Sequence, residues 1–302
     1  MTSDDRRPSN RLARLEGFGL VNLSTLTWAT NMVLGRWLRD AVGPLTLAAA
    51  RYSIASLLFA ILLQRCPPED RRIGRDRWLL LGMALTGVAL FTPTLYLGLR
   101  HTTAVNATLI NGLGPLVTGL LATILIREPM SRRQVVGAIV ALAGVIVLIT
   151  GGTLTLWHAI RGNVGDLITL AALVQWALYS ILARRAMRQR SALSAAAFSA
   201  FLGLPLLLIA AAWELHTLPV DPAPQIILAL VYLGVAPGLI GLLAWNAGVR
   251  RLGPSGAMVF YNTLPLYGTL LGYLFLHEPI GPSHLIGGAL IVGGGLWAAR
   301  ER

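Results

Sequence analysis

The chain has 302 residues, of which 55% are hydrophobic and only 13% are charged, about half the charged share of an ordinary soluble domain. So few charges cannot cover the surface of a water-soluble protein, and the composition excludes a disordered, fibrous or nucleic-acid-binding chain. The net charge of +12 comes from 25 basic residues, all of them arginines. The single cysteine, Cys66, excludes an internal disulfide framework and any multi-cysteine metal site. The composition therefore indicates a membrane protein.

Ten apolar stretches are each close to the length of about 20 residues that a helix needs to cross a bilayer. In chain order they cover residues 17–35, 45–64, 78–99, 103–126, 133–150, 164–183, 193–213, 225–247, 255–276 and 283–299. The runs are continuous rather than alternating, which favours helices over the strands of an outer-membrane barrel. We therefore expect an all-α integral membrane protein with ten transmembrane helices. A charged tail over residues 1–16 precedes the first of them, and the connections leave no room for a soluble catalytic domain.

The arginines predict the orientation, because cytoplasmic connections retain arginine and translocated connections are depleted of it. If the tail over residues 1–16 is cytoplasmic, twenty arginines fall on the cytoplasmic side. The opposite side holds only Arg36, Arg39, Arg100 and Arg161, and one further arginine lies within the second span. This distribution predicts an even number of spans, with both termini in the cytoplasm.

The sequence also contains an internal repeat, because a shift of 150 positions aligns residues 98–144 with residues 248–294 without a gap. The matched pairs include the prolines Pro115 and Pro265, and the Glu-Pro pairs that begin at Glu128 and Glu278. A shift of 148 positions aligns Trp28-Ala29 with Trp176-Ala177. The repeat therefore extends to the first and sixth predicted helices.

The repeat divides the chain into two five-helix halves, residues 17–150 and 163–302, joined by a loop over residues 151–162. Because five is an odd number, the second half enters the membrane from the opposite side. Inverted repeats recur in secondary transporters, where the halves exchange conformations to give alternating access to a central site. The alternative interpretation is that the duplication only makes a stable bundle.

Several short motifs follow one another in a defined order and recur in the second half. In the first half they are Trp28-Ala-Thr-Asn31, Gly35-Arg36, the run from Pro44 to Tyr52, Tyr96-Leu-Gly98, Pro115, Glu128, Gly137 and Gly144. With these motifs the chain resembles the EamA-type carriers of the drug/metabolite transporter superfamily. Within that family it resembles the YddG-like exporters of aromatic and other neutral amino acids.

The resemblance implies a secondary transporter, without ATP, that exports small amphipathic metabolites across the bacterial inner membrane. It implies aromatic and neutral amino acids as cargo, and no enzymatic activity. Two features depart from the family pattern: Pro129 and Pro279 follow the acidic residues, and the seventh helix has no counterpart of Arg51. The two halves therefore need not contribute equally to the site.

Aromatic and amide side chains within the predicted spans are the candidate substrate-binding residues, because a cavity lined by such groups suits a zwitterion with an apolar side chain. They are Trp28, Asn31, Tyr96, Asn111, Trp176, Tyr179, Trp245, Asn246, Tyr261 and Asn262. Trp28 and Asn31 are three residues apart and share a helix face, as do Trp176 and Tyr179. For any single aromatic residue, ordinary packing or an interfacial position is the alternative.

Arg51 allows two interpretations, because an ionisable residue within a span is costly and therefore a functional candidate unless the interface is within reach. It anchors a substrate carboxylate or the first helix, or it is structural and either reaches the outer interface or pairs with Asp40. Pro115 and Pro265 are the hinge candidates, since proline removes a helical hydrogen bond. Static kinks that shape the bundle are the alternative for both prolines.

The acidic residues favour a facilitative mechanism over proton antiport. Glu16, Glu128, Asp166 and Glu278 all fall at predicted helix ends, where capping or ion pairing explains them. We expect no metal, since His277-Glu278 lacks the second histidine of a zinc motif, and no cofactor.

The expected partners are the lipid bilayer and a small amphipathic substrate, namely a neutral or aromatic amino acid. We expect no nucleic-acid partner. The protein is expected to be a monomer or a homodimer. The alternatives are a drug or nucleotide-sugar carrier of the same superfamily and, as a different class, a membrane-embedded transferase.

Overall fold

The continuous apolar runs fold entirely as helices, without a strand, in the computed structural model, which describes residues 7–151, 164–220 and 222–299. The α-helices are α1 (Arg7–Trp37), α2 (Pro44–Leu63), α3 (Arg77–Met83), α4 (Phe91–His101), α5 (Ala104–Asn111), α6 (Gly114–Ile126), α7 (Arg132–Thr150), α9 (Val164–Ala186), α10 (Ala192–Glu214), α11 (Pro224–Val235), α12 (Gly241–Tyr261), α13 (Thr263–Leu276) and α14 (Pro282–Ala299). Short 3-10 helices cover Leu38–Asp40 and Pro68–Arg71, and two π-helical segments, η3 (Ala84–Leu90) and η4 (Ala236–Ile240), join α3 to α4 and α11 to α12. The predicted all-α class is confirmed, and nearly all of the predicted loop over residues 151–162 lies outside the described residues.

Each of the ten predicted stretches falls on a helix or on a pair of helices, although the lengths differ from those expected. Within the described residues, six continuous helical stretches are long and apolar enough to cross a membrane, and α5 with α6 forms a seventh that is bent by 44°. α13 is apolar but only 14 residues long, and α1 begins at Arg7, well before the predicted start of the first span. The structure thus gives a multi-pass membrane protein, and the count of ten spans stays a prediction.

Local chemistry sets several helix ends. Ser131 and Gln134 form a capping box at the start of α7, in which the Ser131 backbone N–H donates to Gln134 Oε1 at 2.8 Å. The helix ends at Gly151, whose φ of 61° is a left-handed conformation that glycine adopts without strain. Thr103 caps α5 by accepting the backbone N–H of Asn106. These ends follow the ordinary capping rules.

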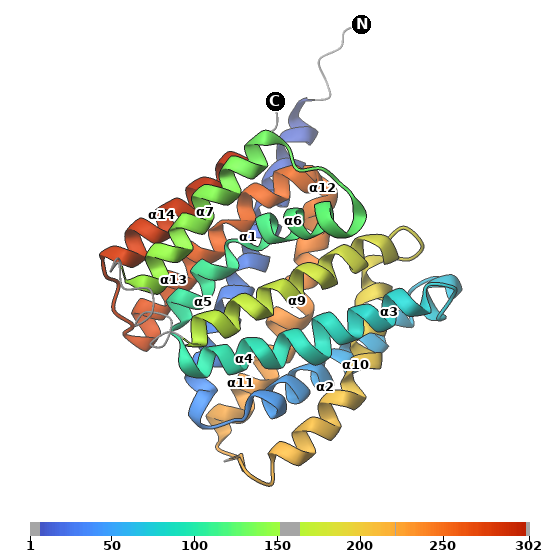
Figure 1. Ribbon diagram of the computed structural model, residues 1–302. Coiled ribbons are helices and arrows are strands. Elements are labelled where there is room, and N and C mark those ends of the chain that lie inside the picture. The colour runs from blue at the N-terminus through green and yellow to red at the C-terminus, as the bar shows by residue number, and fades with distance from the viewer. Residues whose placement is uncertain (1–6, 152–163, 221, 300–302) are drawn as a thin grey trace, which may run out of the picture.

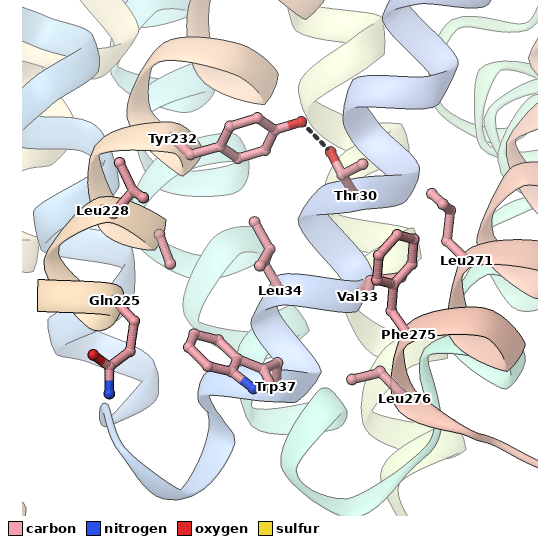
Figure 2. A pocket seen from close by; sticks show the side chains of 11 residues that line it. Thr30, Val33, Leu34, Trp37, Gln225, Leu228, Tyr232, Leu271, Phe275 and Leu276 are labelled. Atoms are coloured by element: carbon pink, nitrogen blue, oxygen red, sulfur yellow. Dashed lines mark hydrogen bonds between the residues drawn. The ribbon is translucent and has the colours of Figure 1, made fainter. Parts of the chain in front are cut away.

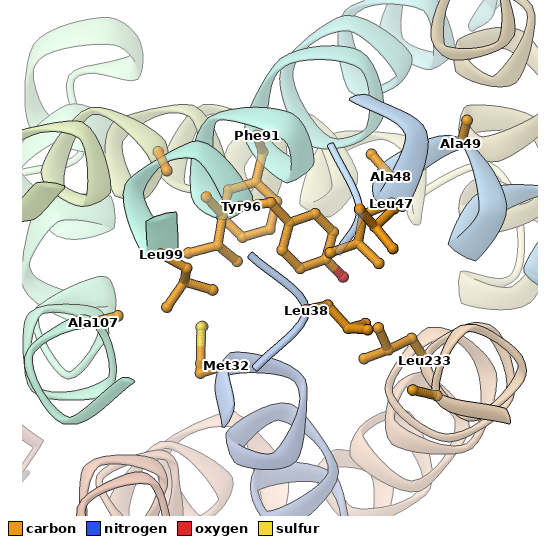
Figure 3. Close-up of a cluster of buried hydrophobic side chains, with 14 of the residues drawn as sticks. Met32, Leu38, Leu47, Ala48, Ala49, Phe91, Tyr96, Leu99, Ala107 and Leu233 are labelled. Atoms are coloured by element: carbon orange, nitrogen blue, oxygen red, sulfur yellow. The ribbon is translucent and has the colours of Figure 1, made fainter. Parts of the chain in front are cut away.

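One cluster of buried apolar side chains lies where α1, α2, α4 and α11 meet. Tyr96 lies among Met32, Leu38, Leu47 and Phe91, and all five side chains are buried (Figure 3). The outer face carries large apolar side chains as well, such as Leu228, which is 71% exposed. An apolar face of this extent is abnormal in water and normal against lipid.

The helix boundaries repeat along the chain at the same shift of 150 positions that aligns the two halves of the sequence. Phe91 begins α4 and Gly241 begins α12, each directly after a π-helical segment. Arg127 and His277 follow α6 and α13 with left-handed φ values of 55° and 52°. One difference stands out: α4 and α5 are separate helices, whereas α12 runs without a break from Gly241 to Tyr261.

Helices α7 and α14 lie side by side (Figure 1) and approach closely through glycines. A Cβ atom added at Gly294 would lie 2.5 Å from the carbonyl oxygen of Gly137, and one added at Gly137 would lie 2.5 Å from that of Gly294. Gly144 and Gly287 form a second reciprocal pair, at 2.6 and 2.7 Å. Small residues of this kind let helix backbones meet in a membrane, and here they do so within one chain.

This contact predicts opposite effects for two adjacent glycines. Gly294→Ala should destabilise the protein by about 1–3 kcal/mol, because the new methyl group overlaps the backbone of α7. Gly293→Ala is the matched control, since nothing lies within 4 Å of its added Cβ and alanine improves helix propensity by up to about 1 kcal/mol. Thermal unfolding of both variants in detergent measures the difference, and equal melting temperatures would contradict the close contact.

Candidate substrate site

Six aromatic rings from four helices meet in one group, which we call the aromatic cluster. It consists of Trp28, Phe91, Trp176, Tyr179, Trp245 and Tyr261. Trp28 lies at its centre, with ring centroids 6.3 Å from Trp176, 5.5 Å from Trp245 and 6.2 Å from Tyr261. Five of the six residues are among those predicted from the sequence, and the structure therefore brings together side chains that lie up to 233 positions apart.

The duplicated positions and the π-helical segments together place these rings. Trp28 on α1 and Trp176 on α9 occupy aligned positions of the two halves and meet edge to face, with an interplanar angle of 73°. Phe91 directly follows η3, and Trp245 lies one turn beyond η4. A π-helical turn shifts the face on which the following residues lie and is frequent at functional sites. The equivalent π-helical segments thus lead into the two ring-bearing helices α4 and α12.

Phe91 is the member of the aromatic cluster that the sequence prediction missed. Its ring centroid lies 5.0 Å from that of Trp176. The prediction selected residues with both an aromatic ring and a polar group, and phenylalanine has no polar group. Its counterpart in the second half, Gly241, has no ring, so the repeat gave no signal for it either.

Next to the aromatic cluster lies a polar triad of Asn31, Arg51 and Tyr96. Arg51 Nη1 donates to Asn31 Oδ1 at 3.2 Å and to the Tyr96 hydroxyl at 3.4 Å. The Tyr96 hydroxyl in turn donates to Asn31 Oδ1 at 2.8 Å. Asn31 follows Trp28 by three residues on α1, which is a rise of about 4.5 Å, or slightly less than one turn. The predicted residues Asn31, Arg51 and Tyr96 thus adjoin the rings.

The remaining predicted residues lie outside both groups. Asn111 is buried and donates to the Ala107 carbonyl oxygen of its own helix at 2.9 Å. Asn262 is buried at the break between α12 and α13, and its Oδ1 lies 2.8 Å from a Cβ added at Gly295 on α14. Asn246 is half-buried on α12, one residue after Trp245. Their contact with substrate stays a prediction.

Pro115 and Pro265 lie in equivalent places, each in the first turn of a helix that follows a break. Pro115 opens α6 after the bend between α5 and α6, and Pro265 opens α13 after the break at Asn262. A Cβ added at Gly112, within the first break, would lie 2.9 Å from the Pro265 side chain. The two breaks therefore pack against each other, and movement about them stays a prediction.

The acidic residues behave as end-of-helix groups, as predicted. Glu278 is buried and accepts the backbone N–H groups of Ala104 and Val105, both at 2.9 Å. Asp166 is buried and accepts hydrogen bonds from Thr102 and from Asn106. Glu128 and Glu16 form exposed ion pairs with Arg184, at 2.6 Å, and with Arg251, at 3.2 Å. These contacts account for all four acids without catalysis.

A pocket of about 480 Å³ opens on a different face of α1, between α11 and α13 (Figure 2). Its walls include Leu34, Leu228 and Phe275, and at one end Thr30 and Tyr232 share a hydrogen bond of 2.9 Å. None of its lining residues belongs to the aromatic cluster. The pocket is almost wholly apolar and faces outward, so the polar triad, rather than this pocket, has the chemistry to hold a polar substrate.

The helices have apolar outer faces suited to contact with lipid, and they surround a group of aromatic and polar side chains. These features are typical of a multi-pass membrane transporter. The chain belongs to the EamA-like transporter family, whose model matches residues 15–150 and again residues 163–299. The prediction of an EamA-type carrier of the drug/metabolite transporter superfamily is thereby confirmed.

Relatives named as transporters match almost the whole chain. The uncharacterized transporter YyaM of Bacillus subtilis is 28% identical over 284 residues, which cover 93% of this chain and 92% of YyaM. A probable terminal-alkyne amino-acid exporter of Streptantibioticus cattleyicolor is 27% identical over 272 residues, which cover 90% of this chain and 89% of the relative. A solved crystal structure with 26% identity superposes with a TM-score of 0.61 over 97% of this chain and 96% of that one.

Proposed function

We propose that the protein is a secondary transporter that exports small amphipathic metabolites, above all aromatic and other neutral amino acids, across the bacterial inner membrane. The observation that carries the proposal is the aromatic cluster with the polar triad one helical turn away. Rings bind an apolar side chain through stacking or edge-to-face contacts, each contributing about 0.5–1.5 kcal/mol. Hydrogen-bonding groups beside them suit the charged main-chain groups of an amino acid. The YddG-like resemblance and the exporter among the relatives support the same cargo.

The transport path follows from ten spans arranged as two inverted five-helix repeats with cytoplasmic termini. Trp28 and Trp176, from equivalent positions of the two repeats, are in contact. Movement of one repeat against the other therefore changes the space between these rings, and alternating access uses such a movement. The breaks beside Pro115 and Pro265 allow the adjoining helices to reorient. The site thus opens to one side of the membrane at a time.

The mechanism is facilitative, because neither the aromatic cluster nor the polar triad contains a carboxylate or a histidine. Arginine keeps its proton under all ordinary conditions and cannot relay one. A nucleotide-sugar carrier must hold phosphate groups, and the two groups of residues together offer a single cation. This composition favours neutral amino acids over nucleotide sugars.

Trp28→Ala should lower the initial rate of phenylalanine transport about tenfold or more. The substitution removes the central ring of the aromatic cluster, which contacts three other rings. A loss of about 1.4 kcal/mol of binding free energy corresponds to a factor of ten. The fold should persist, since the neighbouring rings remain. Proteoliposome transport assays measure the rate. Trp213→Ala is the matched control, because that ring is 69% exposed on α10. If both variants transport at the wild-type rate, the aromatic cluster is not the site.

A further inference from the structure

Arg51 is a half-buried cation that has no acidic partner among the residues that the structure describes. It lies about 10 Å along α2 from the start of that helix at Pro44, at a rise of 1.5 Å per residue. Its guanidinium contacts only neutral groups: Asn31 Oδ1, the Tyr96 hydroxyl and, at 5.6 Å, the ring of Tyr52. Among the described residues no carboxylate lies within 4 Å of it, and its buried Nε has no hydrogen-bond partner.

Pairing with Asp40 does not fit these contacts, whereas the bond to Asn31 ties α2 to α1 and leaves the rest of the guanidinium for a ligand. Asp40, the acid available near that end of α2, pairs with Arg39 at 3.1 Å. The guanidinium contacts Asn31 and Tyr96, whose residues are only 4% and 1% exposed. The side chain is therefore held toward the middle of the bundle.

Other arginines within the fold show the arrangement that Arg51 lacks. Arg190 binds Asp76 through two hydrogen bonds, Nε to Oδ2 at 2.5 Å and Nη2 to Oδ1 at 2.7 Å. Arg36 Nε lies 3.8 Å from Glu278 and its Nη1 donates to two backbone carbonyl oxygens. The bonds of Arg51 to neutral acceptors are longer, at 3.2 and 3.4 Å, than charge-assisted bonds of about 2.7–2.9 Å. A buried charge without a counter-charge is unfavourable, so the site favours an anion.

We infer that Arg51 binds the carboxylate of the transported molecule, and that a carboxylate is the feature shared by its substrates. The guanidinium offers a planar pair of donors that matches a carboxylate, and its unpartnered Nε is one of them. Asn31 and Tyr96 are positioning residues that orient the guanidinium. The aromatic cluster one turn away receives the side chain. This inference rests on the proposed function, because it assumes that the rings and the triad form one transport site.

The test is competition for labelled phenylalanine uptake in proteoliposomes by unlabelled phenylalanine and by phenylalaninamide. The amide keeps the ring and the amino group and replaces the carboxylate with a neutral carboxamide. The concentration of the amide that halves uptake should be at least about ten times that of phenylalanine. A site that binds a carboxylate through a charge-assisted pair of hydrogen bonds rejects an analogue that lacks the carboxylate. An amide that competes as well as phenylalanine overturns the inference.

Variants of Arg51 separate carboxylate binding from a purely structural role. Arg51→Gln should remove the preference for phenylalanine over its amide, whereas Arg51→Lys should keep the preference with weaker binding, because the charge remains without the planar pair of donors. Arg39→Gln, which alters an exposed pair, should behave as wild type. If Arg51→Gln keeps the wild-type preference, the inference is wrong. Should that variant fail to fold, Arg51→Lys still tests the inference, because wild-type affinity for phenylalanine in Arg51→Lys would contradict binding by a planar pair of donors.

The same assay distinguishes failure of this inference from failure of the proposed function. If the wild type takes up no amino acid, the proposed function is wrong. If it takes up phenylalanine but does not distinguish the acid from the amide, only the role of Arg51 is wrong.

Discussion

Glu278→Ala is expected to destabilise the protein by about 2–4 kcal/mol, because each buried polar group left without a partner costs about 1–3 kcal/mol. The carboxylate accepts the backbone N–H groups of Ala104 and Val105 at the start of α5, both at 2.9 Å. It also lies 3.8 Å from Arg36, which binds the carbonyl oxygens at the end of α4. One side chain therefore ties α13 to the junction of α4, α5 and α1.

The repeat supplies the control for this variant. Glu128 occupies the equivalent position after α6, but its side chain is 50% exposed and pairs with an equally exposed Arg184. Exposed pairs contribute about 0.2–1 kcal/mol, so Glu128→Ala should have a much smaller effect. Unfolding of both variants in detergent, by heat or denaturant, gives the comparison. Equal losses of stability would contradict the capping role of Glu278.

Asp76→Asn should cost about 3–5 kcal/mol, the range for breaking a buried ion pair by removing one partner. Asp76 precedes α3 and Arg190 lies between α9 and α10, and their side chains are only 2% and 5% exposed. Arg190 also donates to Ser194 Oγ and to the Arg72 carbonyl oxygen. The pair thus joins the two halves of the chain. Asp40→Asn, which breaks an exposed pair with Arg39, should change stability little.

The same pair predicts a dependence of stability on pH. Burial alone would raise the pKa of Asp76, but the hydrogen bonds and charge of Arg190 outweigh it and hold the pKa below its ordinary value. A lowered folded-state pKa means that the stabilisation is complete above the unfolded pKa of about 3.9 and is lost as pH falls through the folded value. The stability difference between wild type and Asp76→Asn should therefore be constant near neutral pH and shrink below about pH 4. A difference that shrinks as pH rises would contradict it.

Much of the fold could be predicted because lipid places a simple demand on sequence. A span must be apolar over its whole length, so each predicted stretch falls on a helix. The breaks could not be predicted this way, since Gly112 lies within one continuous apolar run and the space that requires a glycine there is set by the Pro265 side chain of a distant helix. The difference between the α4–α5 pair and the unbroken α12 has no signal in the apolar pattern.

Those site residues that occupy aligned positions of the internal repeat could be predicted from the sequence. Aligned positions indicated Trp28 and Trp176, whose rings are in contact. The partners of Arg51 depend on how α1, α2 and α4 pack, which no local pattern encodes. For that reason the pairing with Asp40 stood as an alternative until the structure placed Asp40 beside Arg39.

Counterflow of labelled phenylalanine tests the central proposal most directly. Proteoliposomes that contain the purified protein and a high internal concentration of unlabelled phenylalanine are diluted into labelled phenylalanine, without ATP or an ion gradient. We expect the label to accumulate transiently inside, and abolishing any pH gradient should leave this uptake unchanged. The absence of exchange with phenylalanine, tryptophan, threonine and methionine, relative to protein-free vesicles, would contradict amino-acid transport.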